Sequence, residues 1–226
     1  MNFYITDREA REIGISVIAI SVAFAIAIFG LGVFMDLHAA AVVVSFFLAT
    51  IGVGFILHEM AHKVSANFFG AAAEFRMWTQ GLMFMLLLSF MGFVFAAPGA
   101  VYIYSPHLTR RENGIISLAG PATNLVLAMF FIALSIFAPV EIAGMNVWEW
   151  GAMINIFIGF FNMLPMFPLD GSKIIAWSMP VWLVFAAVFF GFGFLLIGPQ
   201  IIVMWALMLA FSFLLSGALF GGRRGY

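Results

Sequence analysis

Long apolar runs alternate with short polar connections along almost the whole chain of 226 residues. A run of about 20 apolar residues is enough for one helix to cross a bilayer. The pattern therefore predicts an all-α membrane protein with six transmembrane helices. The predicted helices cover residues 13–35, 39–66, 114–138, 147–167, 174–195 and 198–220.

A further apolar stretch at 82–103 is ambiguous. It contains Gly92, Pro98 and Gly99, which interrupt a helix, and it ends in AVYIY, which has the composition of a short β-strand. A strand at membrane depth needs a partner inside the protein for its backbone groups. We predict a small re-entrant, partly β element here, and a seventh transmembrane helix is the alternative.

Charges between the apolar runs predict the orientation of the chain. The positive residues are Arg8, Arg11, Lys63, Arg76, Arg110, Arg111, Lys173, Arg223 and Arg224. The connections on the opposite side hold Asp36, Glu141 and Glu149 and no Lys or Arg. Because positive residues collect on the cytoplasmic side, we expect both termini in the cytoplasm. A seventh crossing at 82–103 would move later basic connections outside, which favours the re-entrant interpretation.

The composition agrees with a single membrane-embedded domain over residues 1–226. Hydrophobic residues make up 65% of the chain and charged residues 8%, which excludes a water-soluble globular protein. A net charge of −1 without a basic cluster indicates no nucleic-acid partner, and the lack of cysteine excludes thiolate metal ligands. The sequence does not indicate the oligomeric state.

The second span carries the motif HEMAH, which places His58, Glu59 and His62 within an otherwise apolar helix. Residues four apart lie on one helical face, so two imidazoles can reach one metal ion with a carboxylate beside them as general base. In a soluble helix this pattern often occurs without a metal. Within hydrocarbon each ionisable side chain costs about 2.5–3.5 kcal/mol, so three together favour a metal site. We expect the neighbouring Lys63 to extend to the cytoplasmic surface without a role in chemistry.

A catalytic zinc ion usually takes three protein ligands and one water molecule. The best third candidate is Asp170, because its span and the HEMAH span run in the same direction and bring both sites near the cytoplasmic side. Pro165 and Pro168 interrupt the preceding helix, and Gly171 allows a close backbone approach. A solvated Asp-Gly turn at a helix end is the alternative. Other candidate ligands in cytoplasmic connections are Glu74, His107 and Glu112.

These motifs resemble those of the site-2 proteases, zinc metalloproteases that cleave peptide bonds within membranes. HEMAH is similar to the zinc motif of that family, NMLPMFPLDG to its second signature and SLAGPATN to its Gly-Pro motif. The resemblance covers about 51–173. It implies a three-helix catalytic core at about 39–173, a membrane-embedded β element at 74–104, and peripheral spans at 13–35 and 174–220.

The resemblance also implies roles for individual residues. The ligands of one catalytic Zn²⁺ would be His58, His62 and Asp170. Glu59 would act as the general base. Asn162 would donate a hydrogen bond to the oxyanion of the reaction intermediate, and an interhelical hydrogen bond is an equal alternative for it. For two further amides, Asn124 and Asn155, we expect a packing role.

The sequence therefore predicts an intramembrane zinc metalloendopeptidase of the cytoplasmic membrane with its active site toward the cytoplasmic side. Its expected partners are transmembrane protein or peptide substrates and the lipid bilayer, as in regulated intramembrane proteolysis. A transmembrane substrate must unwind to expose its carbonyls, and the AVYIY edge is expected to accept it as an added strand. The alternatives are a divalent-cation transporter, which the lack of a second acidic site within the spans disfavours, and a catalytically inactive membrane scaffold.

Overall fold

The computed structural model of the chain describes residues 4–94, 98–105, 107–142, 144–203, 206, 207, 209 and 210. Within these residues, four helices are long and apolar enough to cross a membrane. They are Asp7–Phe29, Leu37–Phe68, Arg110–Phe137 and Met179–Ile197. The helical class is confirmed, and the total of six spans stays a prediction.

Helix α1 (Asp7–Phe29) begins earlier than the predicted span at 13–35. The side chain of Thr6 accepts a hydrogen bond from the N–H of Glu9, and this N-cap starts the helix within the polar leading segment. The helix ends at Gly30, whose φ of 74° is a conformation that glycine adopts without strain. The polar N-terminal turns of α1 are thus part of the fold and contribute side chains to it.

The second predicted span is one continuous helical segment made of three parts. After the short helix η1 (Leu31–Met35), α2 (Leu37–Phe47) passes through the π-helical turn η2 (Leu48–Gly52) into α3 (Val53–Phe68). π-Helical turns within α-helices occur often at functional sites, and this one lies directly before the helix that carries HEMAH.

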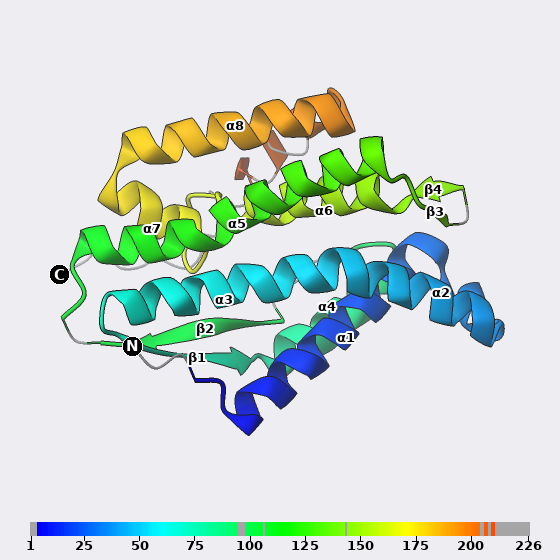
Figure 1. Cartoon of the computed structure of the whole chain (residues 1–226), viewed down its shortest axis with the longest axis horizontal. Helices are drawn as coiled ribbons and strands as arrows, with labels where there is room; N and C mark the ends of the chain where they lie inside the picture. The colour runs from blue at the N-terminus through cyan, green and yellow to red at the C-terminus, as the bar shows by residue number, and fades with distance from the viewer. Residues whose placement is uncertain are drawn as a thin grey trace.

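Two strands, β1 (Ala72–Met77) and β2 (Gly99–Tyr104), form an antiparallel sheet beside α3 (Figure 1). Between them lies α4 (Thr79–Ser89), whose 11 residues are too few to cross a bilayer. The stretch at 82–103 is therefore divided between a short helix and a strand in the described residues. The strand expected at AVYIY is confirmed, and the re-entry of this segment into a membrane stays a prediction.

The second half of the chain returns along α3. Helix α5 (Arg110–Phe137) runs antiparallel to α3 in Figure 1, and a small hairpin of β3 (Glu141–Ile142) and β4 (Met145–Asn146) leads into α6 (Val147–Asn162). Both α3 and α6 thus run in the same direction, as the sequence predicted. This arrangement brings the C-terminal ends of both helices to the same side of the molecule.

The chain after α6 differs from the prediction. α6 ends before the predicted limit at 167 because prolines follow at 165 and 168. The span predicted at 174–195 corresponds to α8 (Met179–Ile197), which is long and apolar enough to cross a membrane, but its predicted first residues lie in a separate short helix, α7 (Asp170–Trp177). Ser178 caps α8, and Pro180 lies in its first turn, where a missing N–H is tolerated. The span predicted at 198–220 falls mainly outside the described residues.

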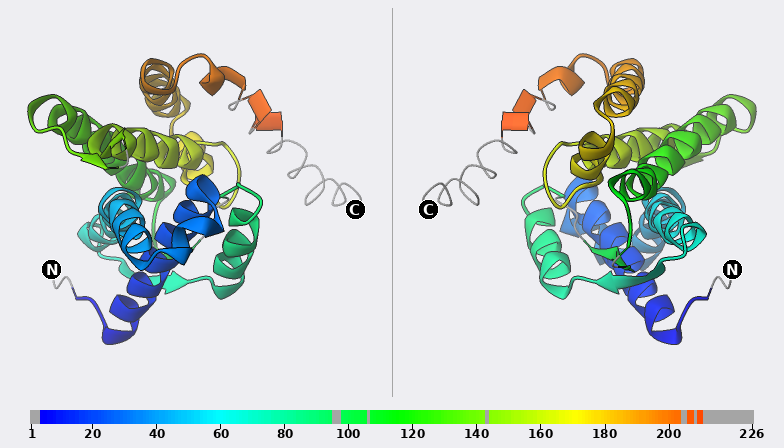
Figure 2. Two further views of the ribbon diagram at one scale, coloured as in Figure 1. Left: turned by 90° about the vertical axis from the view of Figure 1, so that its right-hand side faces the viewer. Right: turned by 90° about the vertical axis from the view of Figure 1, so that its left-hand side faces the viewer.

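The helices pack in layers around α3. Figure 1 shows α3 between α5 on one side and the β1 and β2 sheet on the other, and in both views of Figure 2 α8 and α1 lie on opposite sides of the molecule. One apolar cluster, which includes the fully buried Phe47 and Met85, joins α1, α2, α4 and α6. Another, with Phe160 and Phe189, joins α6, α7 and α8. Because α3 lies between α5 and the sheet, it is buried on two faces, and its buried residues include His58, Glu59, His62 and Lys63.

Candidate metal centre and active site

The two histidines of HEMAH lie on the face of α3 that contacts α5. His58 and His62 are separated by one helical turn, and their Nε2 atoms lie 3.0 Å apart. Their exposed fractions are 3% and 7%, so both imidazoles are enclosed by protein. The spacing predicted from the sequence is thus present as a pair of buried nitrogen donors directed to one point.

Asp170, at the start of α7, completes the group. Its Oδ2 atom lies 3.1 Å from His62 Nε2 and 3.4 Å from His58 Nε2, and the residue is 7% exposed. α7 comes this close because Gly171 packs directly against the backbone carbonyls of Met163 and Leu164, where no side chain would fit. The glycine expected to allow a close approach therefore makes that approach against the end of α6.

The three donor atoms have the spacing that a tetrahedral zinc site requires. Zinc at 2.0–2.1 Å from each ligand demands donor separations of about 3.3–3.4 Å. The separations of 3.0, 3.1 and 3.4 Å are close to these values. Two imidazoles and one carboxylate are also a ligand set that suits zinc. His58, His62 and Asp170 together fit a metal ion, and all three are buried.

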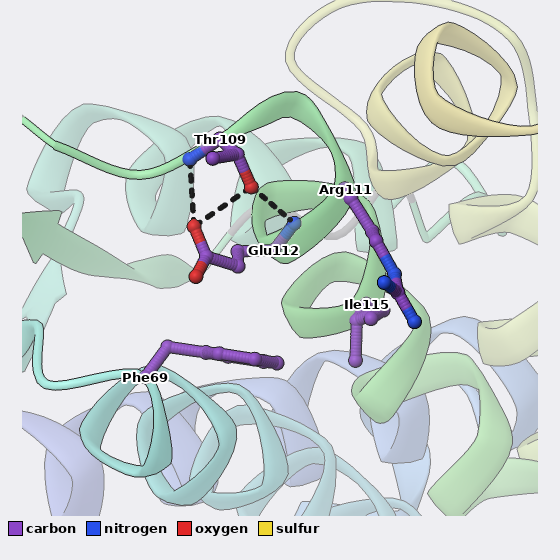
Figure 3. A pocket seen from close by; sticks show the side chains of 5 residues that line it. All are labelled: Phe69, Thr109, Arg111, Glu112 and Ile115. Carbon is purple, nitrogen blue, oxygen red and sulfur yellow. Dashed lines mark hydrogen bonds between the residues drawn. The ribbon is translucent and has the colours of Figure 1, made fainter.

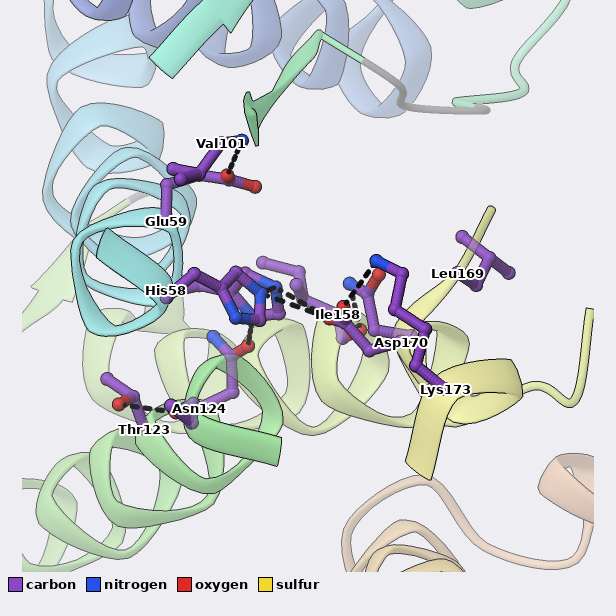
Figure 4. A network of polar contacts seen from close by, with 12 residues as sticks. His58, Glu59, Val101, Thr123, Asn124, Ile158, Leu169, Asp170 and Lys173 are labelled. Atoms are coloured by element: carbon purple, nitrogen blue, oxygen red, sulfur yellow. Dashed lines mark hydrogen bonds and ion pairs between the residues drawn. The ribbon is translucent and has the colours of Figure 1, made fainter. Parts of the chain in front are cut away.

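The second ring nitrogen of each histidine is held by an oxygen of α5. His58 Nδ1 lies 2.6 Å from Asn124 Oδ1, and His62 Nδ1 lies 2.8 Å from the carbonyl oxygen of Ile116. Because both oxygens accept, both Nδ1 atoms carry the proton, and the Nε2 lone pairs are left for a metal. Figure 4 shows His58 between Asn124 and Asp170. The tautomer of each histidine is thereby fixed for metal binding.

The Asn124 amide is itself fixed. Its Nδ2 donates to Asn155 Oδ1 at 2.9 Å and to the carbonyl of Gly54 at 3.3 Å, so its oxygen must face His58. Asn155 in turn donates to the carbonyl of Gly151. We expected only packing for these two amides. The structure gives Asn124 a direct contact with a candidate ligand, and the signal in the sequence was a set of amides within apolar helices.

Gly120 of α5 faces the histidine pair. A Cβ atom at this position would lie 2.5 Å from His62 Nε2 and 2.6 Å from His58 Nε2. The following Pro121 lies inside the helix and removes one N–H from its hydrogen-bond ladder. The Gly-Pro motif therefore lies within α5, where the missing side chain of Gly120 makes room beside the metal cluster.

Comparisons with known proteins agree with this geometry. A family model described as peptidase family M50 matches residues 138–197, which hold α6, α7 and α8. A Methanocaldococcus jannaschii protein named "Putative zinc metalloprotease MJ0611" is 42% identical over 185 residues, 80% of this chain and 90% of the relative. The chain belongs to peptidase family M50. This is the site-2 protease family of zinc metalloproteases, so the resemblance inferred from the motifs is confirmed.

A second M. jannaschii protein, named "Zinc metalloprotease MJ0392", is 30% identical over 60 residues, 26% of this chain and 18% of that protein. No solved structure matches. The M50 membership and the apolar helices together establish a membrane protein of a zinc metalloprotease family.

In this M50 protein, Glu59 is directed away from the metal cluster. Its Oε2 atom accepts a hydrogen bond of 2.9 Å from the N–H of Val101 in β2, as Figure 4 shows. The residue is 8% exposed, so the carboxylate lies between α3 and the sheet. Its role as general base stays a prediction. On the other side of the cluster, Lys173 lies 3.5 Å from the second oxygen of Asp170.

The structure also shows the contacts of Asn162 and Lys63. Asn162 is half-buried and donates to the carbonyl of Ile158 within its own helix, and its oxyanion role stays a prediction. Lys63 does not extend to the surface as expected. It is 2% exposed and forms an ion pair with Glu9 of α1, because the polar first turns of α1 pack against the end of α3.

The other candidate ligands lie apart from the metal cluster. Glu74 pairs with Arg76, and the backbone N–H of His107, an exposed residue, donates to Ser105. Glu112 accepts hydrogen bonds from the N–H and hydroxyl of Thr109 in the capping box of α5.

The capping box borders a cavity of about 550 Å³ between the end of α3 and the start of α5, shown in Figure 3. The residues that line it are Phe69, Thr109, Arg111, Glu112 and Ile115. None of them is a member of the His58, His62 and Asp170 cluster. Glu112 therefore stabilises a helix start in this protein.

The contact between Asn124 and His58 can be tested by metal affinity. Asn124→Leu keeps a similar volume but removes the acceptor of His58 Nδ1, so we expect zinc affinity to fall by about 10–100-fold. Competition with a chelator of known affinity measures this change. Thr123→Val is the matched control, because Thr123 donates only to the carbonyl of Ala119 in its own helix. Equal affinities of the Leu variant and the unmodified protein would contradict this role of Asn124.

Proposed function

We propose that this M50 protein is an intramembrane zinc endopeptidase that hydrolyses peptide bonds in or near transmembrane segments of other membrane proteins. The observation that carries the proposal is the buried cluster of His58, His62 and Asp170. The histidines lie within a helical segment apolar enough to cross a membrane. A hydrolytic metal site enclosed by such helices suits a peptide bond that is itself in the membrane.

The depth of the cluster supports a site below the lipid surface. α3 ends at Phe68, six residues after His62, which corresponds to about 9 Å at 1.5 Å per residue. α5 begins at Arg110, ten residues before Gly120, which corresponds to about 15 Å. Arg110, Arg111 and Lys173 lie near this end, so the positive-inside rule supports a site toward the cytoplasm and cytoplasmic termini.

The residues divide the proposed reaction among them. His58, His62 and Asp170 hold the metal, and a bound zinc ion supplies a Lewis acid that polarises the scissile carbonyl and activates water. Glu59 takes the proton of the attacking water and passes it to the leaving amine. Asn162 remains the candidate donor to the oxyanion. Asn124 and the carbonyl of Ile116 keep both imidazoles oriented throughout.

The β2 strand is the proposed place for the substrate. A transmembrane helix hides its carbonyls in its own hydrogen bonds, so the segment to be cleaved must unwind and needs other partners. An extended segment paired with β2 regains backbone hydrogen bonds. The N–H of Val101 contacts Glu59, which brings this strand next to the proposed base. The partners are therefore transmembrane proteins or peptides within a lipid bilayer, and no nucleic acid.

Removal and return of the metal test the proposed function. We expect purified protein in liposomes to cleave a reporter transmembrane peptide, to lose cleavage when a chelator removes zinc, and to regain it when zinc is added. Mass spectrometry of the products locates the cleaved bond. Cleavage that continues in demonstrably zinc-free protein would contradict the proposal, and so would zinc uptake into the liposomes without any cleavage, which would favour a transporter.

A further inference from the structure

Helix α3 presents a second stripe of side chains to the sheet, next to the stripe that holds the two histidines. The stripe consists of Phe55, Glu59 and Lys63, which are spaced four apart and share one face. Phe55 packs edge-on against Phe75 of β1, with ring centroids 5.8 Å apart. Glu59 accepts the N–H of Val101 in β2. The candidate base is therefore part of a contact surface between the catalytic helix and the β1–β2 sheet.

The third member of the stripe makes a buried ion pair. Lys63 and Glu9 are 2% and 0% exposed, and the second carboxylate oxygen of Glu9 accepts the N–H of Phe75 at 2.9 Å. Burying two charges is costly, and an apolar pair of similar volume often gives equal or greater stability. Stability alone therefore does not account for this ion pair, which ties α1, α3 and β1 together at one point.

Both contacts converge on one pair of residues in the sheet. Phe75 and Val101 lie opposite each other in the register of β1 and β2. Each directs its N–H away from the partner strand, Phe75 toward Glu9 and Val101 toward Glu59, as in a pair without mutual hydrogen bonds. Because Lys63 and Glu59 both belong to α3, this one helix holds the same cross-strand pair from both edges of the sheet.

The two edges of the sheet differ in what covers them. On β1, Glu9 accepts the N–H of Phe75 and Glu12 accepts the N–H of Met77, so α1 occupies two of the three outward donors of that edge. On β2, alternation places the outward groups at positions 99, 101 and 103. In the part of the chain that the structure describes, the N–H of Val101 makes the one hydrogen bond of that edge. An added strand can therefore pair with the outward groups at 99 and 103 of β2, whereas α1 covers the middle and the end of β1.

We propose that Glu9 and Lys63 are positioning residues that hold the open part of the β2 edge against the catalytic helix, so that an extended substrate segment pairs at Gly99 and Ile103, on either side of the Val101 contact with Glu59. This inference rests on the proposed proteolytic function for its substrate. The ion pair acts through the β1–β2 sheet and touches neither the metal ligands nor the substrate. The N-terminal turns of α1 thereby determine which strand accepts the substrate and where that strand lies.

The position of the β1–β2 sheet relative to the helices can be measured without any enzyme assay. The chain has no cysteine, so Tyr102→Cys on β2 and Val184→Cys on α8 take spin labels at two exposed positions only. In the zinc-loaded protein in lipid nanodiscs we expect a narrow distance distribution. Glu9→Gln with Lys63→Met removes the charges at nearly constant shape and is expected to shift or broaden it. An unchanged distribution in the folded double variant would overturn the proposal.

Kinetics separate positioning from a general loss of folded protein. For a transmembrane reporter peptide we expect the double variant to raise KM by about tenfold or more, with full zinc content and nearly unchanged kcat. A merely structural role would lower the active fraction and leave KM unchanged. Arg8→Gln is the matched control, because it breaks an exposed ion pair with Glu12 in the same turns of α1 and is expected to leave both readouts unchanged.

A single variant covers the case in which the double variant does not fold. Glu9→Gln alone keeps an oxygen for the N–H of Phe75 and removes only the charge opposite Lys63, so we expect a smaller change in the same direction. A shifted β1–β2 sheet with an unchanged KM would overturn the role of Glu9 and Lys63 in substrate placement. If the unmodified zinc-loaded protein cleaves no transmembrane peptide, the proposed function fails. The spin-label distances still decide whether the ion pair positions the β1–β2 sheet.

Discussion

Glu59→Gln protein is expected to bind zinc normally and to lose cleavage of a transmembrane reporter peptide by about 10²–10⁴-fold. The amide has nearly the shape of the carboxylate and can still accept the N–H of Val101, so the contact between α3 and β2 is kept. It cannot take up the proton of the attacking water. Metal analysis of the purified variant, beside single-turnover cleavage in liposomes, measures the two properties separately.

Glu149→Gln is the control for this experiment. Glu149 is an exposed carboxylate in the first turn of α6, at the other end of that helix from the metal cluster, and its replacement should leave cleavage unchanged. Undiminished cleavage by the Glu59 variant would remove this residue from the mechanism. Loss of zinc together with activity would instead show that Glu59 supports metal binding.

Gly120→Ala is expected to weaken zinc binding by about a hundredfold and to abolish cleavage with it. The new methyl group would lie 2.5 Å from His62 Nε2 and 2.6 Å from His58 Nε2, so both imidazoles must turn away from Asp170. Alanine favours a helix over glycine by about 1 kcal/mol, so the helix that carries the substitution remains intact. The variant should therefore be folded with a lower zinc content, which thermal unfolding and metal analysis together reveal.

Gly191→Ala in α8 is the matched control for that variant. Among the described residues, no atom lies within 4 Å of the place that a Cβ atom at position 191 would take, so the same substitution there should change neither zinc content nor cleavage. Full zinc occupancy in Gly120→Ala protein would contradict the assignment of the space beside Gly120 to the metal site.

The sequence predicted the helical elements where a single local signal was strong. The long apolar run at 39–66 became one continuous helical segment, and AVYIY became a strand. The predicted bounds were wrong where a capping signal lay within an apolar run. Ser178 and Pro180 start α8 within the predicted span at 174–195, because Ser178 accepts the N–H of Val181 as an N-cap and a proline is tolerated in the first turn of a helix.

The candidate site followed from the sequence as far as residue type and helical spacing could take it. His58 and His62 were placed on one face by their spacing, and Asp170 was chosen from the direction of two spans. The partners that orient them were missed, because Asn124 lies 66 residues from His58. The expectation for Lys63 was wrong for the same reason, since its partner Glu9 lies 54 residues away, before the first predicted span at 13–35.

By itself, the sequence determined the class of the protein and its chemistry. Apolar runs of membrane length, two histidines one turn apart and an aspartate after a proline-rich helix end are local features, and local geometry fixes them. Only the tertiary structure decided which groups surround that chemistry. They are the Asn124 amide beside His58, Gly120 next to both histidines, and the β1–β2 sheet that Glu59 and Lys63 hold. These contacts join segments far apart in the chain, and the packing of whole helices, which no short pattern encodes, brings them together.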